Sequence, residues 1–126
     1  MEENKINTEF ADAFKTRTKK QAVAIIKFLR TIKTNDEINV IKHQLIKSAT
    51  STAANYRAAC RGKSKADFIA KLGIVNEEAD ETVFWLEVLE ELEYKSEELS
   101  KLKIESEELL KIVAKSIATA RNNYNK

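Results

Sequence analysis

Few side chains in this sequence have the types and spacing that catalysis needs. A di-metal site of the ferritin kind requires Glu-x-x-His on two helices, but the only histidine, His43, has Val40 three residues before it. Cys60 lies among arginines and a lysine that would favour its thiolate, yet it has no base or orienting partner nearby. We therefore expect no metal, no cofactor and no enzymatic activity, with His43 at a surface or interface and Cys60 half-buried.

Four acidic residues lie close together between residues 77 and 81. On a helix they cannot all face one way, so spacing alone does not make them a paired-carboxylate site for acid–base catalysis. We expect the polar residues of this region to pair across helix–helix or subunit contacts, with a ligand site as the alternative. Neighbouring aromatic residues add apolar surface typical of contacts between chains. The residues expected at an oligomer interface are Asn55, Arg57, Glu78, Asp80, Glu81, Phe84 and Trp85.

The composition predicts one helical domain over residues 1–126. The chain contains no proline and only two glycines, and it is 43% hydrophobic and 33% charged. No apolar run approaches the ~20 residues that span a bilayer. The single cysteine fits a reducing compartment, and the polar N-terminus does not resemble a secretory signal. We therefore expect a cytoplasmic protein.

Apolar residues at three- and four-residue spacing predict helices over about 8–33, 37–61, 65–94 and 97–122. In the first helix, the polar stretch 17–21 interrupts the apolar side, which includes Val23. Because turns of two or three residues force antiparallel neighbours, the expected fold is all-α, an up-down-up-down four-helix bundle.

Local signals mark the ends of these helices. One of residues 34–36 is expected to cap the second helix, Ser64 the third and Ser96 the fourth. Gly62 is predicted to end the second helix with a positive φ. Gly73, inside the third helix, is predicted to mark a close helix crossing, which would offset its low helix propensity.

Charge is unevenly distributed along the chain. Residues 1–75 carry 15 Lys and Arg against 7 Asp and Glu, residues 76–108 carry 3 against 13, and residues 109–126 carry 4 against none. Folding would gather the basic residues at one end of the bundle and leave the other end acidic. The basic residues form either a solvated face or a contact for nucleic-acid phosphate. The residues predicted to bind nucleic acid are Arg17, Lys19, Lys20, Arg57, Arg61, Lys63, Lys65, Lys71, Lys115 and Arg121.

Several short motifs resemble one bacterial family. They are Gln44-Leu45, Ser48-Ala49, Asn55-Tyr56-Arg57, Ala59, Ser64-Lys65, Phe68, Lys71-Leu72, the run Glu77 to Thr82, and Trp85-Leu86-Glu87. The chain resembles the four-helix-bundle proteins encoded within intervening sequences of 23S ribosomal RNA genes. That family includes the accessory variability protein of diversity-generating retroelements.

The resemblance implies a cytoplasmic homopentamer in which no enzymatic activity is established. Retroelement members of the family are basic proteins that associate with a reverse transcriptase and bind nucleic acid. From the residues and the resemblance together, we expect a non-enzymatic oligomeric assembly or adaptor module that contacts RNA or DNA through its basic end. The alternative is a purely protein-binding scaffold without nucleic-acid contact.

Overall fold

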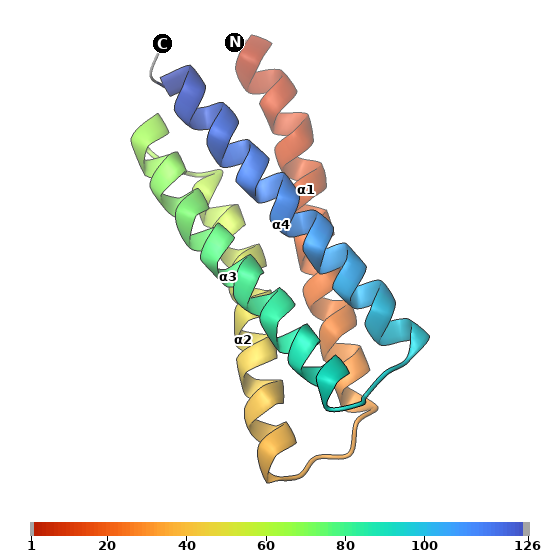
Figure 1. Cartoon of the computed structure of the whole chain (residues 1–126). Coiled ribbons are helices and arrows are strands. Elements are labelled where there is room, and N and C mark those ends of the chain that lie inside the picture. Colours follow the sequence, from red (N-terminus) through yellow and green to blue (C-terminus); the bar gives the residue numbers. More distant parts are fainter. Residues whose placement is uncertain (1, 125–126) are drawn as a thin grey trace.

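Four antiparallel helices form the whole of the described structure. The computed structural model describes the backbone of residues 2–124 and the side chains of residues 8–123. The helices are α1 (Glu2–Arg30), α2 (Asp36–Ala59), α3 (Lys65–Glu91) and α4 (Glu97–Tyr124). Each packs against the next, and α1 also packs beside α4 (Figure 1). The predicted all-α, up-down-up-down bundle is confirmed, although α1 begins at residue 2 rather than 8 and α3 ends at residue 91 rather than 94.

Polar side chains cap three of the helices where the sequence predicted caps. Asn35, Ser64 and Ser96 each accept a hydrogen bond from the backbone N–H three residues later, at 2.8, 3.1 and 3.0 Å respectively. Each bond satisfies one of the free amides in the first turn of a helix. These caps fix where the helices begin and keep the connections between them short.

Both glycine predictions are wrong in their physical detail. Gly62 ends α2 without a positive φ. A Cβ atom there would lie 3.0 Å from the carbonyl oxygen of Ala59 and 3.2 Å from Oδ2 of Asp67, so close packing favours glycine at this corner. At Gly73, no heavy atom of the described residues lies within 4 Å of the position of a Cβ atom. The close crossing expected at Gly73 is therefore not formed within the chain.

The left-handed residue lies instead at the end of α3. Glu93 has a φ of 70°, the only positive φ of a non-glycine residue in the part of the chain that the structure describes. The N–H of Tyr94 then donates to the carbonyl oxygen of Leu89 at 3.0 Å, five residues back. This is the bond of a Schellman motif, which satisfies a carbonyl group that the helix end leaves free.

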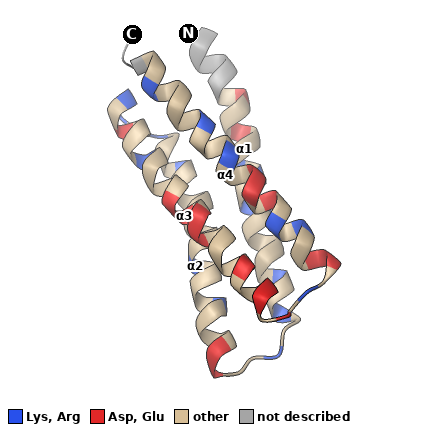
Figure 2. Cartoon of the chain, viewed as in Figure 1, with Lys and Arg blue, Asp and Glu red and all other residues tan. Residues whose placement is uncertain are grey.

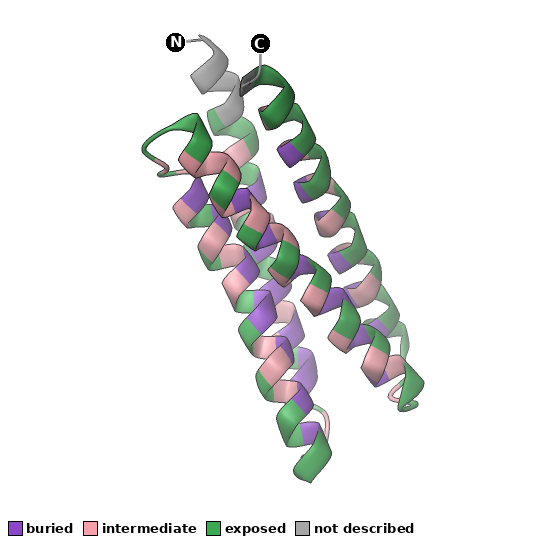
Figure 3. Cartoon of the chain, turned by 60° about the vertical axis from the view of Figure 1, so that its left-hand side comes forward, coloured by how far each residue is buried: buried purple, intermediate pink, exposed green. Residues whose placement is uncertain are grey.

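The core is divided along the bundle axis into two apolar clusters. Buried positions recur along the helices, as the purple segments of Figure 3 show. We call the end where α1 begins and α4 ends the terminal end, and the other the distal end. The distal cluster consists of Ala22, Ile25, Phe28, Leu29, Ile38, Ile41, Leu45, Ala49, Leu86, Leu89, Leu99 and Leu102. The terminal cluster consists of Phe14, Tyr56, Ala59, Leu72, Val75, Leu109, Val113 and Ile117.

A polar layer lies between the two clusters. Its buried members are Thr18, Gln21, Ser48, Thr52, Thr82 and Ser106. Two of them belong to the stretch 17–21, which the sequence analysis treated as an interruption of the apolar side. Val23, assigned to that side, is 44% exposed. The inward face of α1 therefore includes two polar side chains. Gln21 hydrogen-bonds α4, and Thr18 hydrogen-bonds the backbone of its own helix.

Candidate functional site

Six of the basic residues predicted to bind nucleic acid lie exposed towards the terminal end. They are Arg57, Arg61, Lys63, Lys65, Lys115 and Arg121. Among the described side chains, none of the six takes part in an ion pair. The α2–α3 corner and the last turns of α4 carry this group, as the blue segments of Figure 2 show. The structure therefore brings together basic side chains from two separate parts of the sequence, residues 57–65 and 115–121.

Three other predicted residues lie away from this group. Because α1 begins at residue 2, Arg17, Lys19 and Lys20 lie roughly 22–27 Å along it, near the middle of the bundle. The guanidinium of Arg17 donates two bonds of 2.8 Å to the carboxylate of Glu105, a partner 88 residues away. This hydrogen bonding raises the pKa of Arg17. Arg17 thus holds α1 to α4, while Lys19 and Lys20 are exposed.

Acidic side chains reduce the positive charge of the terminal end. The ammonium of Lys71, another predicted residue, donates to both carboxylate oxygens of Asp67 at 2.7 and 2.8 Å. That bond, together with the backbone N–H of Lys63, lowers the pKa of Asp67. On α1, Asp12 pairs with Lys15 at 3.1 Å. The positive surface is therefore concentrated on the α2–α3 corner and the end of α4.

The distal end carries exposed acidic residues. These are Glu87, Glu91, Glu93, Glu97 and Glu98. A sixth, Glu90, accepts a bond of 2.8 Å from Lys103, and this bond raises the pKa of Lys103. Exposed Lys27, Arg30 and Lys33, at and just after the end of α1, offset part of this negative charge, so the predicted acidic end is only partly formed by the described side chains.

The aromatic residues predicted at an oligomer interface lie on the outer side of α3. Phe84 is 52% exposed and meets the ring of Trp85 edge to face, with centroids 4.9 Å apart. Trp85 is half-buried and packs partly against the distal cluster. Its indole N–H points at a carboxylate oxygen of Glu81 at 3.5 Å. The bundle thus leaves an apolar face of α3 uncovered.

The polar residues predicted at the same interface do not form one network within the chain. The amide of Asn55 donates to the carbonyl and hydroxyl oxygens of Ser51, within its own helix. Arg57 and Asp80 are exposed. Glu78 differs, because its Oε2 atom is buried without a hydrogen-bond partner among the described residues. Burial, and then the charge of Glu81, raises the pKa of Glu78.

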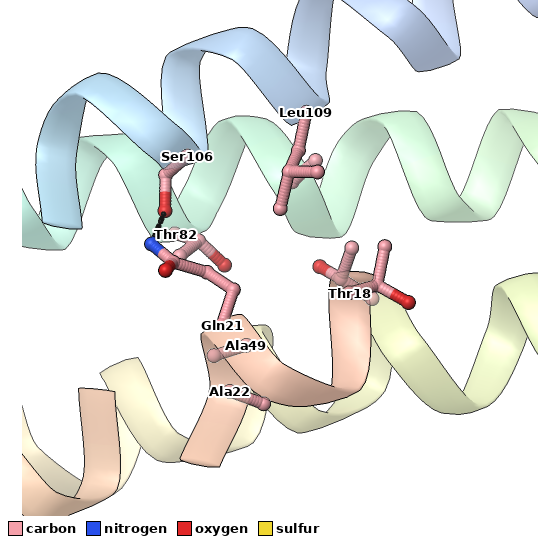
Figure 4. Close-up of a pocket in the computed structure, with 9 residues that line it drawn as sticks. Thr18, Gln21, Ala22, Ala49, Thr82, Ser106 and Leu109 are labelled. Atoms are coloured by element: carbon pink, nitrogen blue, oxygen red, sulfur yellow. Dashed lines mark hydrogen bonds between the residues drawn. The ribbon is translucent and has the colours of Figure 1, made fainter. Parts of the chain in front are cut away.

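The polar layer between the two clusters was not predicted from the sequence. The amide of Gln21 donates to the hydroxyl of Ser106 at 2.9 Å, as Figure 4 shows. It also donates to the carbonyl oxygen of Leu102 at 2.7 Å. The hydroxyl of Thr82 donates to that of Ser48 at 3.0 Å. A cavity of about 10 Å³ remains beside these groups, the size of one water molecule. The signal was the four-, three- and four-residue spacing of residues 14, 18, 21 and 25.

The two residues weighed for catalysis lie in separate places. His43 is exposed, and its Nδ1–H donates to the carbonyl oxygen of Asn39 at 2.8 Å. Cys60 is half-buried, and its backbone N–H donates to the carbonyl oxygen of Tyr56 at 3.1 Å. Burial raises the pKa of the Tyr56 hydroxyl. Within the described residues, no three His, Cys, Asp or Glu side chains are grouped to hold a metal. Over the same residues, no helix is long and apolar enough to cross a membrane.

Comparison with known proteins gives the family. Residues 13–115 match the model of the 23S rRNA-intervening sequence protein family. A crystal structure at 1.70 Å resolution, of a protein of unknown function from the S23 ribosomal protein family of Bacteroides thetaiotaomicron VPI-5482, is 33% identical. The match covers 86% of this chain and 97% of that one, with a TM-score of 0.77. No curated protein matches the chain. The chain therefore belongs to the 23S rRNA-intervening sequence protein family.

Proposed function

We propose that this chain is a cytoplasmic, non-enzymatic subunit of a homo-oligomer that contacts RNA or DNA through its terminal end. The observation that carries the proposal is the group of six exposed basic side chains at that end, which make no ion pair with any described residue. Lysines and arginines that are free of carboxylate partners can neutralise phosphates and release counterions. Such contacts hold a nucleic acid in place without reading its sequence.

Charge reversal at the α2–α3 corner tests this contact. Arg61→Glu, Lys63→Glu and Lys65→Glu together should abolish or greatly weaken binding of a single-stranded RNA, measured by fluorescence anisotropy over a salt series. With Ala in place of Glu, the slope of log K against log salt should fall by about 2 for three lost phosphate contacts.

A matched control exists near the distal end. Residues 27, 30 and 33 are likewise two lysines and one arginine, all exposed. Reversing those three charges changes the net charge equally. Because they lie away from the proposed contact, binding should fall much less than in the first triple variant. Equal losses for the two triple variants would show that only net charge matters and would refute a local contact. No binding at low salt for the wild type would favour the alternative, a purely protein-binding scaffold.

The oligomer is proposed to form through the outer face of α3. Ile74, Glu78, Glu81 and Trp85 follow one another at four-, three- and four-residue spacing and so share this face. Ile74 is 45% exposed, and the buried carboxylate oxygen of Glu78 lacks a partner. A neighbouring subunit would cover Ile74 and offer a hydrogen-bond donor to the carboxylate of Glu78. The family resemblance makes a ring of five subunits our proposal for its closed form.

Gly73 allows the assembly to be tested separately from stability. A Cβ atom there meets no heavy atom of the described residues, so Gly73→Ala should stabilise the isolated chain by about 0.5–1 kcal/mol through helix propensity. If a second subunit approaches α3 at this point, the same change should weaken the oligomer in light scattering. Wild-type chains that remain monomeric at micromolar concentration would refute the proposed ring.

A further inference from the structure

A groove of about 900 Å³ opens at the terminal end. It lies between α1, the end of α2, the start of α3 and the last turns of α4. In this region α1 and α4 extend beyond the α2–α3 corner (Figure 1). Its volume falls within the roughly 300–1,000 Å³ of pockets that hold small organic ligands.

The floor of the groove is apolar and continuous with the terminal cluster. Phe68 and Ile112 are half-buried and pack against that cluster. Phe10, which also lines the groove, is 48% exposed and stacks on Phe14 with centroids 5.7 Å apart. Phe14 in turn meets the ring of Tyr56 edge to face at 4.7 Å. An apolar ligand lying here would extend a packed aromatic series and cover Phe10.

The rim of the groove is positively charged. Lys65 from α3 and Lys115 from α4 line it, both are exposed, and neither takes part in an ion pair among the described residues. None of the described residues that line it is acidic, although the chain has 20 Asp and Glu. The hydroxyls of Ser116 and Thr119 lie on the same rim and can donate to an anion.

We propose that this groove binds a long-chain carboxylate, with its chain on the apolar floor and its head group between Lys65 and Lys115. An apolar ligand without charge would make no use of the lysines, and a cationic amphiphile would be repelled by them. The carboxylate can accept charge-assisted hydrogen bonds from both ammonium groups. The proposal concerns a different ligand from the nucleic-acid contact, and the two share Lys65 and Lys115, whereas the apolar floor serves the carboxylate alone.

Calorimetric titration with dodecanoate, below its micelle concentration, tests the charge requirement. Dodecanoate should bind saturably, whereas dodecyltrimethylammonium, with the same chain and the opposite charge, should bind at least tenfold more weakly. Acetate, which has the head group alone, should not bind measurably. Equal binding of the two amphiphiles, or no binding of dodecanoate, would overturn the proposal.

Paired variants on α4 test the place of binding. Ala120→Trp should fill the groove and abolish dodecanoate binding, whereas Ala118→Trp changes an exposed residue outside it and should leave binding unchanged. Lys115→Glu should weaken binding by about fivefold to tenfold, and Lys111→Glu, one turn away and outside the lining, by much less. Circular dichroism establishes that each variant folds.

The groove has one competing occupant, a second copy of the chain. Sedimentation velocity of the wild type and of Ala120→Trp distinguishes the two. If Ala120→Trp dissociates an oligomer that dodecanoate leaves intact, a neighbouring subunit covers the groove and the proposal is wrong. If the variant loses dodecanoate binding and keeps its oligomeric state, the groove is the ligand site.

Discussion

The two halves of this bundle differ in how completely their apolar clusters are covered. In the distal half, Ile25, Leu86, Leu89 and Leu99 are fully buried, and partly buried residues such as Tyr94 pack against them. In the terminal half, the cluster is smaller and opens into the groove. The same four helices therefore form a filled core at one end and an incompletely covered one at the other.

The contrast separates stability from binding. The larger distal cluster is expected to contribute more to the free energy of unfolding than the terminal cluster, because hydrophobic stabilisation scales with the apolar area removed from water. The terminal half keeps apolar area and unpaired cations accessible, as binding surfaces require. The distal half can thus hold the helices in place while the terminal half meets a ligand or partner.

The largest expected effect tests which half holds the fold. Leu86→Ala, in the distal cluster, should lower the free energy of unfolding by about 3 kcal/mol through lost burial and a cavity. Phe68→Ala, on the floor of the groove, should cost about 1 kcal/mol, because its half-buried ring leaves no enclosed cavity. Urea denaturation of both variants measures the difference. Equal losses would contradict the division into a filled and an open half.

A second, smaller effect tests the polar layer that separates the halves. Ser106→Ala should cost about 1 kcal/mol, since the buried amide of Gln21 loses one of its two acceptors. The double variant with Gln21→Leu should recover to within about 0.5 kcal/mol of the wild type, because it removes the amide as well. Thermal and urea denaturation of the single and double variants complete the cycle. Additive losses would show that the two side chains do not act as a pair.

The smallest effect concerns pH and the unpartnered carboxylate of Glu78. Its pKa is raised above the ordinary value of 4.5 by burial, so the folded chain holds this proton more tightly than the unfolded chain. Stability should therefore fall as pH rises from 4.5 through the raised pKa. Glu78→Gln should gain stability at pH 7 and match the wild type below pH 4, as followed by urea midpoints. The exposed neighbour Glu77→Gln is the control, and a gain of the same size there would argue against burial as the cause.

Sequence periodicity predicted the α2 side of this arrangement well. Ile38, Leu45 and Tyr56 recur at helical spacing and are all buried, since burial on one helix follows directly from period and polarity. The caps were equally local and equally predictable, because each needs only a residue and the amide three positions later.

Features that join distant segments were not predictable in the same way. Gln21 is polar, and it can be buried only because α4 supplies acceptors for its side-chain amide. The pairing of Arg17 with Glu105 likewise depends on how α1 packs beside α4. The extension of α1 back to residue 2, six residues before its predicted start, was not predicted either. The positive φ predicted at Gly62 is found instead at Glu93. The α2–α3 corner needs close packing at Gly62, whereas the end of α3 needs a left-handed residue. The groove depends on the same extension of α1 and α4.

The even number of helices has a mechanical consequence. The start of α1 and the end of α4 lie at the same end of the rod, side by side (Figure 1). A pulling force applied through the two ends of the chain would act across the α1–α4 pair and peel these helices apart turn by turn, instead of sliding them along each other. Single-molecule extension should therefore record yielding at low force that begins at the groove, with the tightly packed half giving way last.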